Sequence, residues 1–299
     1  MTTREESILL DSFELKIRDI TSVELDRLHA LSIGVSWPHR AEDWQMLRET
    51  GRGIAALDEI ERVLGSAMWF PYTEDFASVG MVITSPRLQA QGAARWLMDR
   101  VLAETGDRPL GLNATRAAHQ LYRSMGFIAE ATVSQCQSVA NPPPSAPLPA
   151  GASLHGVEKG DLPALAALDR DAYGADRTTL LGHLLAKSSG VALSRRGRIA
   201  AFALCRRFGR GHVVGPVVAG NVADAIAVTR PHVADHAGRF LRLDTRQNGG
   251  AFFQFLTRSG LSVFDTVTTM SLRQRWTMHE PTAEGTRPTT YALVSQALG

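Results

Sequence analysis

A predicted strand at Met81 to Thr84 is followed by a loop and then by a predicted helix that begins near Gln89. Where the loop leads into the helix, the chain has a run of mostly small residues, Gln89-Ala90-Gln91-Gly92-Ala93-Ala94. The first amides of a helix have no partners inside the helix and carry the positive end of its dipole. Because no large side chain covers them, the amides from Gln91 to Arg95 suit a phosphate group. Gly92 would let the phosphate approach the backbone closely.

The same run also fits a plain helix start in which alanine serves only helix propensity. A Rossmann dinucleotide site is disfavoured, because the Gly-x-Gly-x-x-Gly spacing is absent and the preceding strands alternate as hairpins. The loop by itself therefore predicts an anion site without naming the anion.

The elements that would position this loop follow from hydrophobic periodicity and turn residues. The first half of the chain reads as strand, two helices, three strands, helix, strand, helix, strand. The second half repeats this order, which indicates a duplicated fold. A last strand is expected at Tyr291 to Val294, added to one of the sheets. We predict a mixed α/β (α+β) protein of two tandem domains, each a mostly antiparallel sheet flanked by helices.

Five prolines between Asn141 and Gly151 indicate a semi-rigid linker. The predicted domains are therefore 1–140 and 152–299, joined by a linker at 141–151.

Composition narrows the class of protein. The 299 residues are 44% hydrophobic, enough for two cores, and the formal charge of +2 favours neither a nucleic-acid nor a membrane partner. Cys136 and Cys205 are predicted to be buried free thiols rather than a disulfide. The first ten residues do not resemble a secretory signal, and no apolar run is long enough to span a bilayer. We expect a cytoplasmic monomer or homodimer with no metal site.

Two motifs in the first half resemble those of the GCN5-related N-acetyltransferase (GNAT) superfamily. The loop Gln89-Ala90-Gln91-Gly92-Ala93-Ala94 is similar to the family's Gln/Arg-x-x-Gly-x-Gly/Ala pyrophosphate loop. The segment from Ala118 to Phe127, AHQLYRSMGF, resembles its second motif, in which a helix bearing a tyrosine ends at Gly-Phe. The resemblance covers about Phe13 to Val139 and extends to the second half by topology.

The resemblance implies acetyl-CoA as the cofactor, with the loop residues from Gln89 to Arg95 at its diphosphate. Backbone groups of Val82, Ile83 and Thr84 would meet the pantetheine arm, and an amide there would face the oxyanion. Asn113, on the neighbouring strand, would offer its side chain to the cofactor, or would simply bond to the local backbone.

Tyr122 is the candidate general acid and would also contact the cofactor. A phenol of ordinary pKa can protonate a departing thiolate at little cost. The alternative is a tyrosine that only packs in the core.

The acceptor amine must also lose a proton. The candidate bases are Glu74, Asp75 and His39, although the two acids fit an ordinary solvated turn as well. In the family the loop that holds His39 commonly walls the acceptor pocket, and Arg40 could bind an acceptor carboxylate. Aromatic side chains that could line such a pocket, or pack in the core, are Trp37, Trp44, Trp69 and Tyr72.

The second half departs from both motifs. Aligning Gly260 with Gly126 places Leu256 opposite Tyr122, and the loop Ala219 to Asp224 lacks the Gln-x-x-Gly-x-Ala form. We therefore expect the second half to have lost the acid and the grip on the cofactor. The predicted function is acetyl-CoA-dependent N-acetylation of a small-molecule amine by the first half. The alternative is a coenzyme A-binding sensor without turnover.

Overall fold

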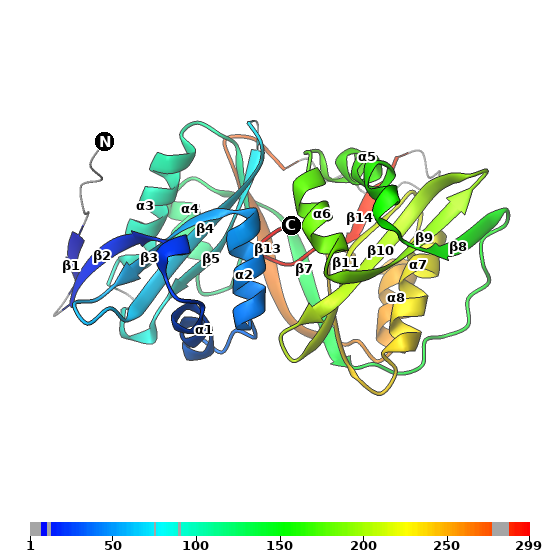
Figure 1. Cartoon of the computed structure of the whole chain (residues 1–299), viewed down its shortest axis with the longest axis horizontal. Coiled ribbons are helices and arrows are strands. Elements are labelled where there is room, and N and C mark those ends of the chain that lie inside the picture. The colour runs from blue at the N-terminus through cyan, green and yellow to red at the C-terminus, as the bar shows by residue number, and fades with distance from the viewer. Residues whose placement is uncertain (1–6, 11–12, 75, 89–90, 277–286) are drawn as a thin grey trace. The chain divides into compact units, whose positions relative to one another are not determined.

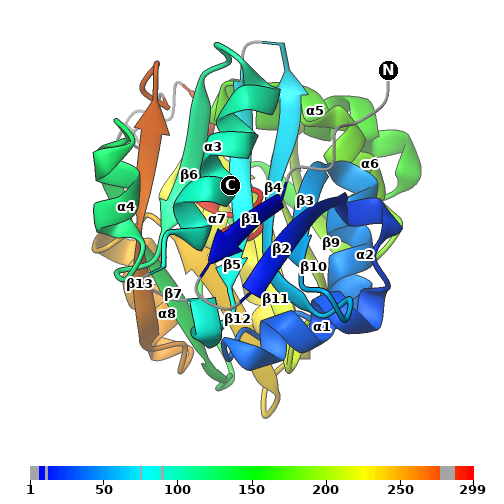
Figure 2. The same ribbon diagram turned by 90° about the vertical axis from the view of Figure 1, so that its left-hand side faces the viewer.

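The computed structural model describes residues 7–10, 13–74, 76–88, 91–276 and 287–299. The chain forms two compact units, Met1–Pro109 and Leu110–Gly299 (Figure 1). Each unit contains a mainly antiparallel sheet with helices packed on it (Figure 2). The predicted fold class is confirmed.

The strands of the first unit pair in chain order, β1-β2-β3-β4-β5, each antiparallel to the next. Helix α3 packs on β4 and β5, and Leu97 of this helix lies against Gly65 of β4, where a Cβ would leave too little room. The elements are β1 (Ser7–Leu10), β2 (Phe13–Asp19), the 3-10 helix η1 (Ile20–Ser22), α1 (Leu25–Gly34), α2 (Ala41–Thr50), β3 (Arg52–Leu57), β4 (Val63–Thr73), β5 (Phe76–Thr84), the 3-10 helix η2 (Pro86–Leu88) and α3 (Ala93–Thr105).

The strands of the second unit pair in the order β6-β13-β7-β12-β11-β10-β9-β8, and β14 pairs with β11. Neighbours are antiparallel except β11 and β12, which are parallel. Helix α7 packs on β9, β10 and β11. The elements are β6 (Leu110–Ala114), α4 (His119–Ser124), β7 (Ile128–Val139), β8 (Ala152–Gly156), the 3-10 helix η3 (Lys159–Asp161), α5 (Leu162–Tyr173), α6 (Thr178–Leu185), β9 (Ser188–Arg195), β10 (Arg198–Phe208), β11 (Gly211–Ala219), α7 (Val222–Asp235), β12 (Phe240–Thr245), α8 (Gly250–Arg258), β13 (Val263–Leu272) and β14 (Thr289–Ala292).

The predicted duplication is visible in the order of elements. From β2 to β7 (the first half) and from β8 to β13 (the second half), both series run strand, two helices, three strands, helix, strand, helix, strand. The two halves exchange strands: β13 inserts between β6 and β7, and β7 in turn pairs with β12. This exchange places the last elements of the first half in the second compact unit. The tandem boundaries at 140 and 152 therefore remain a prediction about the repeat, distinct from the division into compact units.

Other expectations concern single segments. Residues 141–149 form neither helix nor strand, as proline predicts. Strand β14 joins the sheet through β11, which confirms a final strand, although it begins and ends two residues earlier than predicted. Cys136 and Cys205 are free and buried, as expected. The insertion of β13 between β6 and β7 was not predicted.

Candidate functional site

Helix α3 begins at Ala93, and Gly92 before it has a left-handed φ of +88°. The prediction that this helix begins near Gln89 is wrong, because a left-handed residue cannot continue a right-handed helix. Gln89 and Ala90 lie outside the described residues. Gly92 is exposed, and a Cβ placed on it would meet no described atom within 4 Å. The space above the helix start is therefore open to a ligand.

The first turn of α3 carries no cap from the described side chains. None of them accepts a hydrogen bond at this N-cap, and the turn contains no acidic residue. Gln91 and Ala94 are half-buried, Ala93 is buried and Arg95 is exposed. Because the described residues of this turn supply neither a side-chain cap nor an acid, the positive helix end can bind an anion. These residues fit a diphosphate.

Strand β5, which leads into this loop, contains a bulge. Met81 and Val82 together stand opposite Ala67 of β4, and Met81 has a φ of +52°. Ser66 Oγ donates a hydrogen bond of 2.8 Å to the Met81 carbonyl oxygen. A bulge turns backbone groups away from the ladder, and non-glycine residues with positive φ cluster at functional sites. No feature of the sequence predicted this bulge, because Met and Val are ordinary strand residues.

The three predicted backbone contacts lie at this bulge and beyond it. Ile83 has a buried side chain, whereas Val82 and Thr84 are half-buried. Their backbone groups, rather than their side chains, are what the prediction requires. It remains a prediction.

A pocket of about 440 Å³ lies beside the entrance to the loop. Arg27, Arg62 and Arg87 line it together with Glu61, and Ser85 and Pro86 line it at the start of η2. Arg62 is paired with Asp58 at 2.7 Å. Arg27 is likewise paired with Glu24 at 3.2 Å, so carboxylates offset two of the three guanidinium groups. Sequence reasoning missed the pocket, because its arginines come from three separate segments.

The candidate bases differ in their surroundings. Glu74 is 96% exposed and forms an ion pair with Arg108 at 2.8 Å, as in the solvated turn that was the alternative to a catalytic role. Asp75 lies outside the described residues. His39 is half-buried, with its ring centroid 5.8 Å from that of Trp37 and 6.5 Å from that of Trp44. Of the two candidate bases that the structure describes, His39 is thus the one in an aromatic, partly apolar setting.

Arg40 caps helix α2 and is held by Asp43 through hydrogen bonds of 2.9 and 3.0 Å. These bonds raise the pKa of Arg40 above its usual value. The aromatic residues divide into two groups. Trp44 and Trp69 are buried in the core, whereas Trp37 and Tyr72 are half-buried and still available to wall a pocket.

Asn113 and Tyr122 belong to the second unit. Asn113 Nδ2 donates to the Gln296 carbonyl oxygen at 2.8 Å, and its Oδ1 accepts from Thr269 Oγ1 at 2.7 Å. Both ends of this amide therefore have partners in the chain, which favours the bonding role over the cofactor role.

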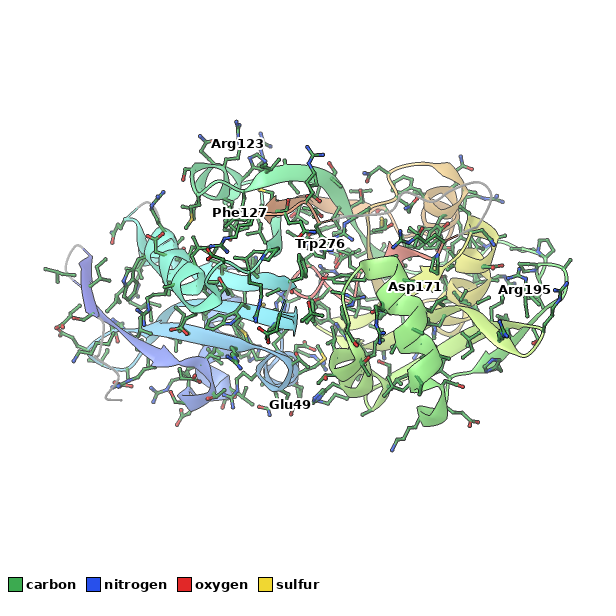
Figure 3. All side chains as sticks on the ribbon, turned by 90° about the horizontal axis from the view of Figure 1, so that it is seen from above. Glu49, Arg123, Phe127, Asp171, Arg195 and Trp276 are labelled. Carbon is green, nitrogen blue, oxygen red and sulfur yellow. The ribbon has the colours of Figure 1, made fainter. Side chains whose placement is uncertain are left out.

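Tyr122 is buried in α4, with its ring 5.7 Å from that of Phe127, which is labelled in Figure 3. Burial raises the pKa of Tyr122 above its ordinary value. The phenol therefore stays protonated at neutral pH, the form that a proton donor needs, but it also becomes a weaker acid. Packing in the core and proton donation are both compatible with this position.

The second half carries different residues at the positions that correspond to Tyr122 and to the phosphate loop. Helices α4 and α8 end in the same way, with Phe127 N–H bonded to the Tyr122 carbonyl and Leu261 N–H bonded to the Leu256 carbonyl. Leu256 thus stands where the first half has Tyr122. Gly126 and Gly260 follow with φ of +90° and +82°, as this helix end requires.

Helix α7 starts at Val222 with Asn221 as its cap, and Asn221 Oδ1 accepts from the Asp224 N–H at 3.0 Å. The Asp224 carboxylate is paired in turn with Arg195 of β9 (labelled in Figure 3), with one contact of 2.7 Å. The helix start that corresponds to the phosphate loop is therefore already capped and carries a negative charge.

Comparison with known proteins agrees with this geometry. Two models of the acetyltransferase (GNAT) domain match the chain, over residues 49–129 and 165–282. An uncharacterized N-acetyltransferase of Bacillus subtilis (strain 168), YitH, is 25% identical over 267 residues, which cover 88% of this chain and 91% of the relative. The chain is a tandem-domain protein of the GNAT superfamily.

Solved structures share the fold. A protein from Pyrococcus horikoshii that is described as an acetyltransferase has a TM-score of 0.77 at 15% identity, and the match covers 100% of both chains. A tandem GNAT protein from the clavulanic acid biosynthesis pathway has a TM-score of 0.62 at 14% identity, over 86% of this chain and 98% of that one. Membership in this superfamily supports acyl-CoA-dependent N-acetylation as the general activity. Members of the superfamily generally use acetyl-CoA as the donor and amines of small molecules or proteins as acceptors.

Among the described residues, none of the helices is long and apolar enough to cross a membrane. The same residues contain no cluster of three or more His, Cys, Asp or Glu side chains suited to a metal ion.

Proposed function

We propose that this protein transfers the acetyl group of acetyl-CoA to the amine of a small molecule, and that the first half carries the reaction. The observation that carries the proposal is the start of α3, where left-handed Gly92 leaves the first turn uncapped and open. Its counterpart at α7 is capped by Asn221 and carries Asp224. Of these two helix starts, the one at α3 therefore suits a diphosphate and the one at α7 does not.

We assign each residue its role in the proposed reaction from its position in the fold and from the groups around it. Amides of the first turn of α3 bind the diphosphate, and the bulge of β5 presents backbone groups at Val82 to the pantetheine arm and the carbonyl oxygen. Acetyl-CoA supplies the thioester that the amine attacks. His39 is the preferred base, since it is half-buried among aromatic rings, and Glu74 and Asp75 are its competitors. Tyr122 donates its hydroxyl proton to the departing thiolate.

The experiment is the substitution Gly92→Glu, followed by titration with coenzyme A in a calorimeter. A side chain at Gly92 would project into the open space, and a carboxylate there would repel the diphosphate. We expect coenzyme A binding to be lost. Undiminished binding would overturn the assignment.

Gly106→Glu is the matched control, because Gly106 lies at the other end of α3, also with positive φ and no described atom within 4 Å of a Cβ. It tests whether the loss comes from strain in the helix rather than from the site. We expect Gly106→Glu to bind coenzyme A as the unaltered chain does.

A coenzyme A-binding sensor that transfers nothing is the second candidate. The burial of Tyr122 and the solvated position of Glu74 favour it, since neither is placed as a strong catalyst requires. Release of free thiol from acetyl-CoA across a panel of amines separates the two functions. Turnover with any amine supports transfer, and binding without turnover supports the sensor.

A further inference from the structure

Strands β11 and β12 of the second half diverge after a short parallel pairing. They pair at His212 with Leu241 and at Val213 with Arg242. Beyond that point β14 takes the place beside β11, with its residues paired to Val217, Val218 and Ala219. The opening between the two strands is therefore occupied by a segment of the same chain.

The segment also bonds to β12 on its other side. Leu293 N–H donates to the Asp244 carbonyl oxygen at 2.9 Å, and Thr245 Oγ1 donates to the Tyr291 carbonyl oxygen at 2.6 Å. The side chains from Tyr291 to Val294 are completely buried. Residues 289–294 thus bridge the two diverging strands as an inserted strand does.

The bulges of β5 and β11 align the two halves residue by residue. In β11, Gly215 and Pro216 together stand opposite Leu204, as Met81 and Val82 stand opposite Ala67 in β5. Counting onward from the bulge, Val217 and Val218 correspond to Ile83 and Thr84. Two of the three residues that pair with β14, Val217 and Val218, are therefore the counterparts of residues proposed to meet the pantetheine arm.

The bulge of β11 is adapted to this occupant. A Cβ on Gly215 would lie 1.9 Å from the Leu293 carbonyl oxygen, so only glycine lets the segment come so close. Pro216, the counterpart of Val82, has no N–H to offer to an oxyanion. The bulge of the second half therefore has room for a peptide segment and lacks the N–H that the bulge of the first half presents at Val82.

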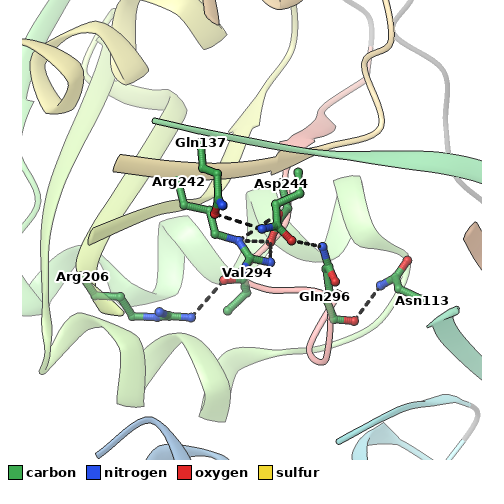
Figure 4. A network of polar contacts seen from close by, with 8 residues as sticks. Asn113, Gln137, Arg206, Arg242, Asp244, Val294 and Gln296 are labelled. Carbon is green, nitrogen blue, oxygen red and sulfur yellow. Dashed lines mark hydrogen bonds and ion pairs between the residues drawn. The ribbon is translucent and has the colours of Figure 1, made fainter. Parts of the chain in front are cut away.

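Side chains hold the rest of the segment in place (Figure 4). Arg206 donates to the Val294 carbonyl oxygen at 3.0 Å, and Asn113 donates to that of Gln296 at 2.8 Å. Arg177, itself paired with Asp169 at 2.7 Å, donates to the Gly299 carbonyl oxygen at 2.7 Å. Donors from several elements therefore converge on the carbonyl groups of one peptide.

We propose that the cleft between β11 and β12 is a peptide-binding site and that its ligand is residues 289–299 of this chain. The segment fills the position that the cofactor arm takes in the first half, a comparison that rests on the proposed function. Main-chain hydrogen bonds to β11 and β12 hold the ligand, and Asp224 closes the helix end that would take a diphosphate. The chain accordingly binds one coenzyme A molecule.

The test is hydrogen exchange of the full chain, with and without saturating coenzyme A, together with calorimetric stoichiometry. We expect the amides of 289–299 to be protected equally in both states, with one coenzyme A per chain. Fast exchange of the segment would overturn the proposal, as would its release with a second coenzyme A. A chain with a protected segment that binds no coenzyme A would overturn the proposed function alone, because exchange of the segment requires no cofactor.

A variant pair sharpens the test. Gly215→Ala adds a methyl group against the Leu293 carbonyl, and we expect the exchange rate of residues 289–294 to rise about tenfold or more. Gly156→Ala is the control, because Gly156 lies in β8 of the same unit with no described atom within 4 Å of a Cβ. Equal exchange in the two variants would contradict the close fit.

Discussion

Helices α3 and α7 hold the same place in the order of elements, yet they begin in opposite ways. Gly92 starts α3 without a side-chain cap or an acid, whereas Asn221 and Asp224 supply both at α7. A helix end needs its amides satisfied, and the chain can do this with its own side chains or leave them for a ligand. The contrast teaches that one copy of a duplicated helix start can diverge by satisfying its amides with side chains of its own chain.

The strands beside these helices differ in the same sense. At β5 the bulge offers the Val82 amide, and at β11 the counterpart is Pro216, with β14 lying alongside. Under the proposed function, the helix end and the strand differ together, so that groups of the second half itself stand in place of both the diphosphate and the pantetheine arm. The following predictions test whether the two halves really divide the work in this way.

The largest expected effect concerns the acid. Tyr122→Phe keeps the ring packed on Phe127 and removes only the proton donor, so turnover should fall by about 10²- to 10⁴-fold while coenzyme A affinity changes little. Stopped-flow or steady-state thiol release measures the first, and calorimetry the second. Tyr173→Phe, a buried tyrosine of the second half, is the control and should leave turnover intact. Normal turnover in Tyr122→Phe would remove Tyr122 from the mechanism.

Arg40 and Arg177 occupy the N-cap position of the second helix of each half, and their substitution should show how burial sets the loss of stability. Arg177 and Asp169 are fully buried, so Arg177→Ala should lower the free energy of unfolding by about 3–5 kcal/mol. Arg40 is 26% exposed, and Arg40→Ala should cost only about 1–3 kcal/mol. Urea denaturation measures both. Equal losses would show that the two positions are not distinguished by burial.

Alkaline pH should weaken the second unit. Burial raises the pKa of Cys136, Cys205 and Tyr291 to about 12 each. Their protonated forms contribute stability that is fully present below the ordinary thiol and phenol pKa values and is lost as pH rises from about 9 towards 12. Each group should lower the free energy of unfolding by at most about 1.4 kcal/mol per pH unit in this range.

Urea midpoints at pH 8, 9 and 10 test this slope, and Cys205→Ala should make it shallower. Tyr122, also in the second unit, should add to the loss because its pKa is raised in the same direction. A flat profile up to pH 10 would contradict the burial of these groups.

The smallest expected effect concerns the caps. Asn221→Ala removes the side-chain bond to the Asp224 N–H and should lower the free energy of unfolding by about 1 kcal/mol. Thermal or urea denaturation would register the change. Coenzyme A binding should be untouched, because the proposed function gives α7 no role in it. A change in coenzyme A affinity would mean that the second half takes part in cofactor binding after all.

Much of the fold could be predicted from the sequence because it depends on short segments. Helix α5, Leu162–Tyr173, is specified by residues of its own segment, and Gly174 ends it with a φ of +87°. Gly126 and Gly260 mark the ends of α4 and α8 for the same local reason. The small-residue loop and the Gly-Phe motif are equally local, and they led to the correct superfamily.

The tertiary structure alone decided which strands become partners. Strand β13 pairs with β6 and β7, and β14 pairs with β11, across separations that periodicity cannot bridge. A strand's pattern specifies which of its faces is buried, but its edge can bond to any strand that reaches it. Likewise, Asn113 looked available in the sequence until the Gln296 carbonyl reached it in the folded chain. The sequence therefore determined the elements and the loop, while long-range pairing decided that the second half seats its own peptide.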